Sequence, residues 1–330
     1  MERRRLGRTA LQTSVIGYGC GAVGGLMVRG SPADQERAIA RAVELGINYF
    51  DTAPLYGDGE SERNLGRVLA TLRPDIVLGT KVRLMPVERG QIGAAVAASI
   101  EASLRRLGRD HVDLFQLHDT ITLDGSSTTL AADVALDDVH AALDRARQQG
   151  KTRFIGITAT GATAALHKVI DAGMFDTAQV VFNMLNPTAG DTAPTGMPGQ
   201  DYGRLLDRAQ RADTGVIGIR ALAGGALSGS EARHPISMAV VAPIGSGPDY
   251  AADVRRARQF DALVREGHAG SLIEAALRFV IAHPTMTTAL VGTSSLDELE
   301  IAGQAANKGP LSQAALDRVA AIAAADHQTT

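Results

Sequence analysis

Short apolar runs typical of β-strands alternate along almost the whole chain with longer segments whose apolar residues recur at helical spacing. The expected strands are residues 14–18, 48–50, 76–80, 112–117, 154–157, 178–182, 216–219 and 288–291. The expected helices are residues 34–45, 60–72, 92–107, 136–147, 164–172, 205–212, 253–266, 272–283, 296–306 and 313–325. Several strands are continuous apolar runs, as parallel strands buried on both faces are. About eight strand–helix units in 330 residues therefore predict an α/β fold closed into a (β/α)8 TIM barrel.

The chain shows no Pro/Gly/Ser-rich linker and no low-complexity tract, so residues 1–330 are expected to form a single barrel domain. Two segments carry no clear pattern, residues 120–133 after the fourth strand and residues 223–250 after the seventh. Loops of this length are usually functional, and loops that follow barrel strands gather on the catalytic face. We expect both to form walls of a substrate site, with plain surface insertions as the alternative.

Composition excludes several classes of protein. The formal net charge is −3, with 33 basic and 36 acidic residues mixed along the chain, so no nucleic-acid or membrane partner is expected. No apolar run approaches the ~18 residues that span a bilayer. The one cysteine, Cys20, fits a reducing compartment and predicts a cytoplasmic protein. We expect a small-molecule substrate and no metal site, and the oligomeric state stays open.

A glycine motif offers a second fold hypothesis. Gly19, Gly21 and Gly24 match the G-x-G-x-x-G fingerprint of a Rossmann-type dehydrogenase. That fingerprint requires a helix that begins within the glycines, whereas helical periodicity here starts only after Pro32. Asp51 also lies further beyond Gly24 than the ~20 residues typical of the fingerprint. The barrel is therefore favoured.

Three apolar strands end in an ionisable residue: Asp51, Lys81 and His118. In a barrel these strand ends stand side by side at one rim, and Tyr56 lies on the loop over the same rim. Each residue alone has an ordinary structural interpretation, as a helix cap, a loop lysine, a core histidine and a turn tyrosine. All four at one rim point to a chemical site.

The group suits reduction of a carbonyl. Hydride delivery to the carbonyl carbon puts negative charge on its oxygen, which then needs a proton and hydrogen-bond donors. Tyrosine has a pKa of ~10 and is a weak acid at neutral pH, but a lysine ammonium favours its phenolate. Asp51 would hold Lys81 in place, and His118 would orient the substrate oxygen.

Residues 46–57 read GINYFDTAPLYG, residues 79–81 read GTK and residues 117–119 read LHD. Together they closely resemble the aldo-keto reductase superfamily, and the resemblance extends from residue 5 to about residue 309. It implies a (β/α)8 barrel that uses NADP(H) or NAD(H), with a hairpin from residues 3–7 closing the barrel floor. It also implies a catalytic tetrad in which Tyr56 is the general acid, Lys81 its partner, Asp51 the residue that orients Lys81, and His118 the residue that positions the carbonyl.

The resemblance also implies a cofactor site. Gln179 occupies the position that binds the carboxamide, and Thr158-Ala159 replaces a Ser-Asn pair, so that only Thr158 can donate. The resemblance also implies that Ile219 lies under the nicotinamide and that Arg220 lies near the pyrophosphate. Arg220 could pair with a phosphate there, and the alternative is that it forms a structural salt bridge. The remaining implied cofactor residues are Gly19, Cys20, Gly21, Asp51, Leu222, Gly292, Thr293, Ser294 and Glu298. Neither Ser294 nor Glu298 is basic, so the choice between NADP(H) and NAD(H) stays open.

The substrate itself is not defined by the sequence. Candidate pocket residues are Tyr18, Leu55, Arg83, Leu84 and Met85. Residues 233–235 (Arg-His-Pro) could meet a polar ligand or form a surface turn. The leading hypothesis is an NAD(P)-dependent oxidoreductase that reversibly reduces an aldehyde or ketone. The alternative within the same fold is a redox-sensing regulatory subunit that binds cofactor with little turnover.

Overall fold

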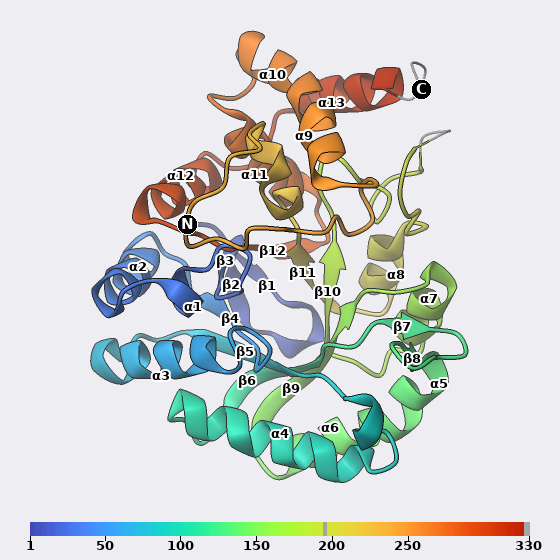
Figure 1. The fold of residues 1–330 in the computed structure, drawn as a ribbon. Helices are drawn as coiled ribbons and strands as arrows, with labels where there is room; N and C mark the ends of the chain where they lie inside the picture. Colours follow the sequence, from blue (N-terminus) through green and yellow to red (C-terminus); the bar gives the residue numbers. More distant parts are fainter. Residues whose placement is uncertain (194–196, 327–330) are drawn as a thin grey trace.

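In the computed structural model, which describes residues 1–193 and 197–326, eight parallel strands close into a barrel. Around the barrel they are β3 (Ile16–Gly19), β4 (Tyr49–Asp51), β5 (Val77–Val82), β6 (Val112–Leu117), β9 (Thr152–Ala159), β10 (Thr177–Val181), β11 (Gly215–Ile219) and β12 (Met286–Val291). All eight coincide with expected strands. The predicted (β/α)8 barrel is therefore confirmed, with helices surrounding the strands (Figure 1).

The helices lie close to their expected bounds. They include α2 (Pro32–Glu44), α3 (Glu60–Leu72), α4 (Ile92–Leu107), α6 (His140–Gln148), α7 (Thr163–Asp171), α8 (Leu205–Arg211), α11 (Leu272–Ala282), α12 (Leu296–Asn307) and α13 (Gln313–Asp326). The expected helix 136–147 begins in a π-helical turn, η3 (Ala135–Val139). Within the described ranges, every helix is too short or too polar to cross a lipid bilayer.

The expected helix 253–266 differs most from the structure. It begins earlier, at Tyr250, because the Asp249 side chain accepts a hydrogen bond from the Ala252 N–H and caps the first turn. It is then divided at the buried Phe260 into α9 (Tyr250–Gln259) and α10 (Asp261–Arg265).

The Rossmann alternative is wrong, because the strands form a closed barrel rather than an open, doubly wound sheet. The glycines serve a different purpose. A Cβ atom on Gly24 would lie 2.5 Å from the backbone N of Thr293 and 2.6 Å from the carbonyl carbon of Gly292. Gly24 therefore lets the loop after β3 pack against the loop after β12. Only a short helix, α1 (Leu26–Arg29), follows this loop.

An antiparallel hairpin of β1 (Arg3–Arg5) and β2 (Gln12–Ser14) precedes the barrel, as the resemblance implied. Leu6, between its two strands, is 0% exposed and joins a cluster with Tyr49, Val77, Leu114 and Ile217. These four residues belong to β4, β5, β6 and β11, so Leu6 closes the end of the barrel where those strands begin. The buried contact ties the hairpin to the barrel.

The two long loops after barrel strands take different forms. Residues 120–133 include β7 (Ile121–Thr122), β8 (Leu130–Ala131) and the start of α5 (Ala132–Val134). After β11, the 3-10 segment η4 (Ala223–Ser228) leads into residues 229–249, which we call the crossing loop. Its Met238 N–H donates to Val23 O at 3.1 Å, and its Ile236 carbonyl accepts from Arg29. The crossing loop therefore spans from the β11 side of the barrel opening to the β3–α1 side (Figure 1).

Candidate active site

The four residues expected at one rim lie together. Asp51 ends β4, Lys81 lies near the end of β5, His118 follows β6 and Tyr56 lies in the loop between β4 and α3. Lys81 is 0% exposed, and its Nζ donates to an Asp51 carboxylate oxygen, to Thr52 O at 2.9 Å and to Tyr56 Oη at 3.3 Å. The ammonium thus joins the carboxylate to the phenol.

The other Asp51 oxygen, Oδ2, is held by residues from three strands. Tyr49 Oη donates to it at 2.9 Å, Gln179 Nε2 at 2.7 Å and Gln116 Nε2 at 3.3 Å. Tyr49 and Gln116 were not identified from the sequence, although each carries a polar group in a strand expected to be buried. Such a residue needs a buried partner, and that signal could have identified them. The network fixes the carboxylate that fixes Lys81.

Burial and charge act in opposite directions on the two proton-bearing groups. Burial lowers the pKa of Lys81, but the charges of Asp51 and Tyr56 outweigh it, and the net pKa is raised. Burial raises the pKa of the Tyr56 phenol, and the Lys81 charge opposes this without reversing it. The expected effect of Lys81 on the phenol is present, yet the net pKa of Tyr56 lies above its usual value. At neutral pH the phenol carries its proton.

His118 stands beside Tyr56, with ring centroids 5.9 Å apart and the two rings nearly perpendicular. Burial, with smaller contributions from the Lys81 and Arg83 charges, lowers the pKa of His118 to about 3. The imidazole is therefore neutral near pH 7, with one N–H to donate. Its buried Nδ1 atom has no hydrogen-bond partner among the described residues.

A cavity of about 620 Å³ opens over these residues at the carboxyl ends of the strands, and both Tyr56 and His118 line it. All but one of the cofactor residues implied by the resemblance also line it: Gly19, Gly21, Asp51, Thr158, Gln179, Ile219, Arg220, Leu222, Gly292, Thr293, Ser294 and Glu298. The exception is Cys20, which is buried behind the wall. Thr158 Oγ1 donates to Gln179 Oε1 at 3.5 Å. The hydroxyl that we expected to act as a donor therefore points toward Gln179, the residue expected to bind the carboxamide of the cofactor.

The candidate substrate residues divide differently. Leu55 lines the cavity, whereas Tyr18, Arg83, Leu84 and Met85 do not. Tyr18 is 1% exposed and its Oη accepts from Thr293, because this strand position faces the packed interior rather than the cavity. Leu84 is 1% exposed and held by a bond from its N–H to Asp119, while Arg83 and Met85 face solvent. Of the five candidates, the structure thus places Leu55 alone in the wall of this cavity.

Several lining residues were missed. The crossing loop contributes Arg233 and His234, for which the sequence allowed either a ligand contact or a surface turn. It also contributes Ser237 and Met238. Thr120 and Thr160 add hydroxyls beside His118, and Tyr250 comes from the start of α9. Of residues 120–133, Thr120 alone lines the cavity, so of the two expected substrate walls the one after β11 is the larger. A loop without periodicity carries no signal of where it folds, which is why these residues were missed.

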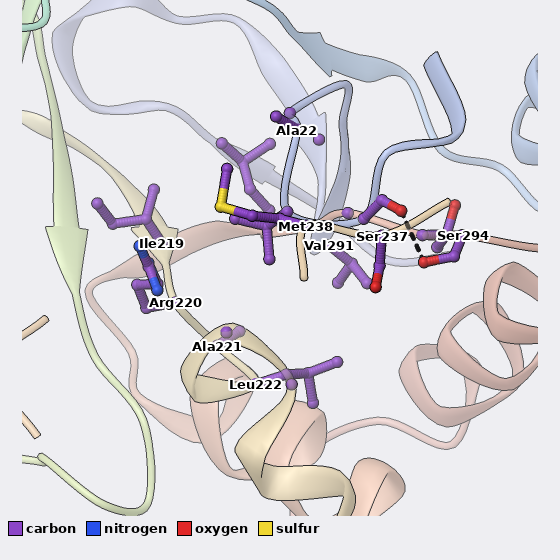
Figure 2. Close-up of a pocket in the computed structure, with 18 of the residues that line it drawn as sticks. Ala22, Ile219, Arg220, Ala221, Leu222, Ser237, Met238, Val291 and Ser294 are labelled. Carbon is purple, nitrogen blue, oxygen red and sulfur yellow. Dashed lines mark hydrogen bonds between the residues drawn. The ribbon is translucent and has the colours of Figure 1, made fainter. Parts of the chain in front are cut away.

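Arg220 begins the loop after β11 with φ = 58°, a left-handed conformation that is uncommon for a side chain of this size. Its guanidinium donates from Nη1 to Ala242 O at 3.1 Å, and burial lowers its pKa. Figure 2 shows Arg220 beside Ile219 on one side of the cavity, with Ser237 and Ser294 on the other. The structural alternative, a salt bridge, is not formed with any described carboxylate.

The fold and site define a (β/α)8-barrel protein with a buried carboxylate–ammonium–phenol relay at the carboxyl ends of its strands. The chain matches the sequence model of the Aldo/keto reductase family over residues 15–324, and it belongs to that family. Relatives of the chain include named oxidoreductases, both dehydrogenases and reductases.

The chain is similar to L-galactose dehydrogenase of Arabidopsis thaliana, with 28% identity over 91% of this chain and 86% of the relative. It is 32% identical to D-threo-aldose 1-dehydrogenase of a Pseudomonas species over 50% of this chain and 55% of the relative. Among solved structures, the holo form of an aldo-keto reductase from Bacillus halodurans superposes with a TM-score of 0.72. That similarity has 25% identity and covers 98% of this chain and 96% of the other.

Proposed function

We propose that this protein is a nicotinamide-dependent oxidoreductase that interconverts an aldehyde or ketone and the corresponding alcohol, with Tyr56 as the proton donor. The single observation that carries the proposal is that the Lys81 ammonium contacts both the Asp51 carboxylate and the Tyr56 phenol, and that Asp51 and Tyr56 line a cavity. The buried Cys20 suits the reducing environment of the cytoplasm, where we place the protein.

The cavity suits a dinucleotide in size and chemistry. Its volume of about 620 Å³ lies within the range of small-molecule and cofactor sites. Glycines from the loops after β3, β11 and β12 form part of the wall, and at Gly21 a Cβ atom would project to within 3.6 Å of the Tyr56 ring. Residues that would hold the cofactor are Gln179 for the carboxamide and Arg220 for a phosphate. When bound, the nicotinamide supplies or accepts the hydride.

The chain's own residues manage the proton. Tyr56 Oη holds it at neutral pH and gives it to the substrate oxygen, which becomes an alcohol. The phenolate left behind lies 3.3 Å from the Lys81 ammonium, whose charge stabilises it. Asp51 keeps Lys81 charged and in place, and neutral His118 donates to the substrate oxygen. In the oxidative direction the same atoms act in reverse.

The test is the Tyr56→Phe variant, assayed for NADH and NADPH consumption with a panel of aldehydes and ketones. Because the variant lacks only the proton donor, its turnover should fall by at least ~100-fold. Its cofactor affinity, measured by fluorescence titration, should stay within about threefold of that of the original protein. Undiminished turnover in the variant contradicts the proposed role of Tyr56. Tight cofactor binding by the unmodified protein without turnover favours the redox-sensing alternative.

The substrate panel follows from the relatives. Two of them are named as dehydrogenases of L-galactose and D-threo-aldose, and others as reductases of L-glyceraldehyde 3-phosphate and methylglyoxal. The panel therefore contains aldoses assayed in the oxidative direction together with small aldehydes assayed in the reductive direction. The hydroxyls of Thr120 and Thr160 at the mouth suit substrates that carry further oxygen atoms.

A further inference from the structure

The charged side chains that line the cavity are separated in space. Arg220 and Arg233 line it from the segment after β11, and neither forms an ion pair with a carboxylate in the described part of the chain. Glu298, in the first turn of α12, lines the end that is formed by the loop after β12. Ser294, in the loop after β12, is hydrogen-bonded to Glu298. Figure 2 shows Arg220 and Ser294 at opposite sides of the view.

Glu298 is held firmly at this end. Its Oε2 accepts from the Ser294 N–H at 2.6 Å, and its own N–H donates to the Ser295 hydroxyl at 3.2 Å. Ser294 Oγ in turn donates to Gly24 O at 2.6 Å. The N–H of residue 294 and the hydroxyls of residues 294 and 295 are therefore already engaged. A group arriving here meets a carboxylate where the start of a helix would otherwise attract an anion.

The other carboxylate oxygen, Glu298 Oε1, has no hydrogen-bond partner among the described residues. A free carboxylate oxygen accepts hydrogen bonds from hydroxyl groups and repels phosphate. Apart from Arg220 and Arg233, the described lining residues include no lysine or arginine. This end of the cavity therefore suits a neutral diol and disfavours a dianion.

We infer that Glu298 selects NAD(H) over NADP(H), by accepting the hydroxyls of the adenosine ribose and repelling a 2′-phosphate. The inference rests on the proposed function, which places the reacting ring beside Tyr56 and Gln179. A dinucleotide extended from that end toward α12 would bring its pyrophosphate past the two arginines and its second ribose toward Glu298. Arginines beside the pyrophosphate and a carboxylate beside the second ribose would favour NAD(H) over NADP(H).

The experiment measures dissociation constants for NADH and NADPH by cofactor fluorescence, without substrate. Two unit charges about 4 Å apart change binding by roughly fivefold in water and by more at lower dielectric, so NADPH should bind at least about fivefold more weakly than NADH. In Glu298→Gln the ratio of the NADPH dissociation constant to the NADH dissociation constant should fall to about two or less, mainly because NADPH binds more tightly. The matched control is Asp297→Asn, which removes a neighbouring carboxylate that does not line the cavity and should leave the ratio unchanged.

A second measurement needs no variant. Because the repulsion is electrostatic, raising ionic strength from about 0.01 M to 1 M shortens the screening length and should bring the two constants together. A ratio at or below one in the unmodified protein overturns the inference, as does a ratio that Glu298→Gln leaves unchanged. Absence of binding by either cofactor would instead overturn the proposed function itself.

Discussion

The imidazole of His118 shows how burial sets the charge of a single group. Among the described residues no carboxylate pairs with it, while Lys81 and Arg83 add positive charge nearby, so every contribution favours the neutral ring. In the proposed mechanism, a neutral imidazole donates a hydrogen bond without competing with Tyr56 as the source of the proton. The proposed tasks of the two residues therefore differ because their environments differ.

This neutrality has a consequence for stability. The folded-state pKa of about 3 lies below the ordinary value near 6.5, so between these values the unfolded chain binds a proton that the folded chain does not. The free energy of unfolding should therefore fall as the pH drops below about 6.5. For His118→Asn, denaturant titrations at pH 7 and pH 5 should show a loss smaller by about 2 kcal/mol than in the unmodified protein.

The control is the same substitution at an exposed histidine, His111→Asn, measured under the same conditions. Equal losses in the His118 variant and the unmodified protein would mean that the imidazole is protonated in the folded state near pH 5.

At the scale of single elements, strands and helices were largely predictable, because hydrophobic periodicity is a local property of the sequence. Helices α3 and α4 lie at their expected bounds, and the ends of β4, β5 and β6 bring together Asp51, Lys81 and His118 as expected. The side chains of a strand that face the cavity were not predictable. Tyr18, within β3, faces the packed interior because barrel register and tilt, which depend on neighbouring strands, decide which side chains face the cavity.

The crossing loop was the least predictable element. Its path depends on hydrogen bonds to distant backbone atoms, such as the bond from Met238 N to Val23 O, and these leave no periodic trace in the sequence. A second link holds the crossing loop in place. Arg29 donates to both Ala22 O and Ile236 O and so joins the crossing loop to the loop after β3, and both segments line the cavity.

Removing this link should loosen the crossing loop. We expect Arg29→Ala to raise the rate of cofactor dissociation by about fivefold, since hydrogen bonds of a charged donor are worth roughly 1.5–3 kcal/mol before solvent exposure reduces them. Stopped-flow fluorescence after mixing with excess competing nucleotide measures this rate. Arg37→Ala, an exposed arginine on α2, is the control. An unchanged rate in Arg29→Ala would show that the loop does not retain the cofactor.

At the scale of the whole molecule, the barrel separates stability from chemistry along its axis. The hairpin and Leu6 close the end where the strands begin, whereas Tyr56, Lys81, His118 and the cavity lie at the end where they finish. Layers of buried side chains lie between these two ends, so we expect a change at the floor to alter the stability of the protein more than the site.

Leu6→Ala tests this separation. Truncating a fully buried leucine should lower the free energy of unfolding by about 2–5 kcal/mol, through lost apolar burial and a residual cavity. The kcat of the folded fraction should nevertheless stay within about twofold of the original value, because, of the described residues that form the cluster with Leu6, only Leu290 also lines the cavity. Chemical denaturation and steady-state assays well below the melting temperature measure the two quantities on one preparation. A large loss of kcat with the cofactor affinity preserved would show that the floor positions Asp51 and Lys81 through Tyr49, which belongs to the same cluster as Leu6 and also donates to Asp51.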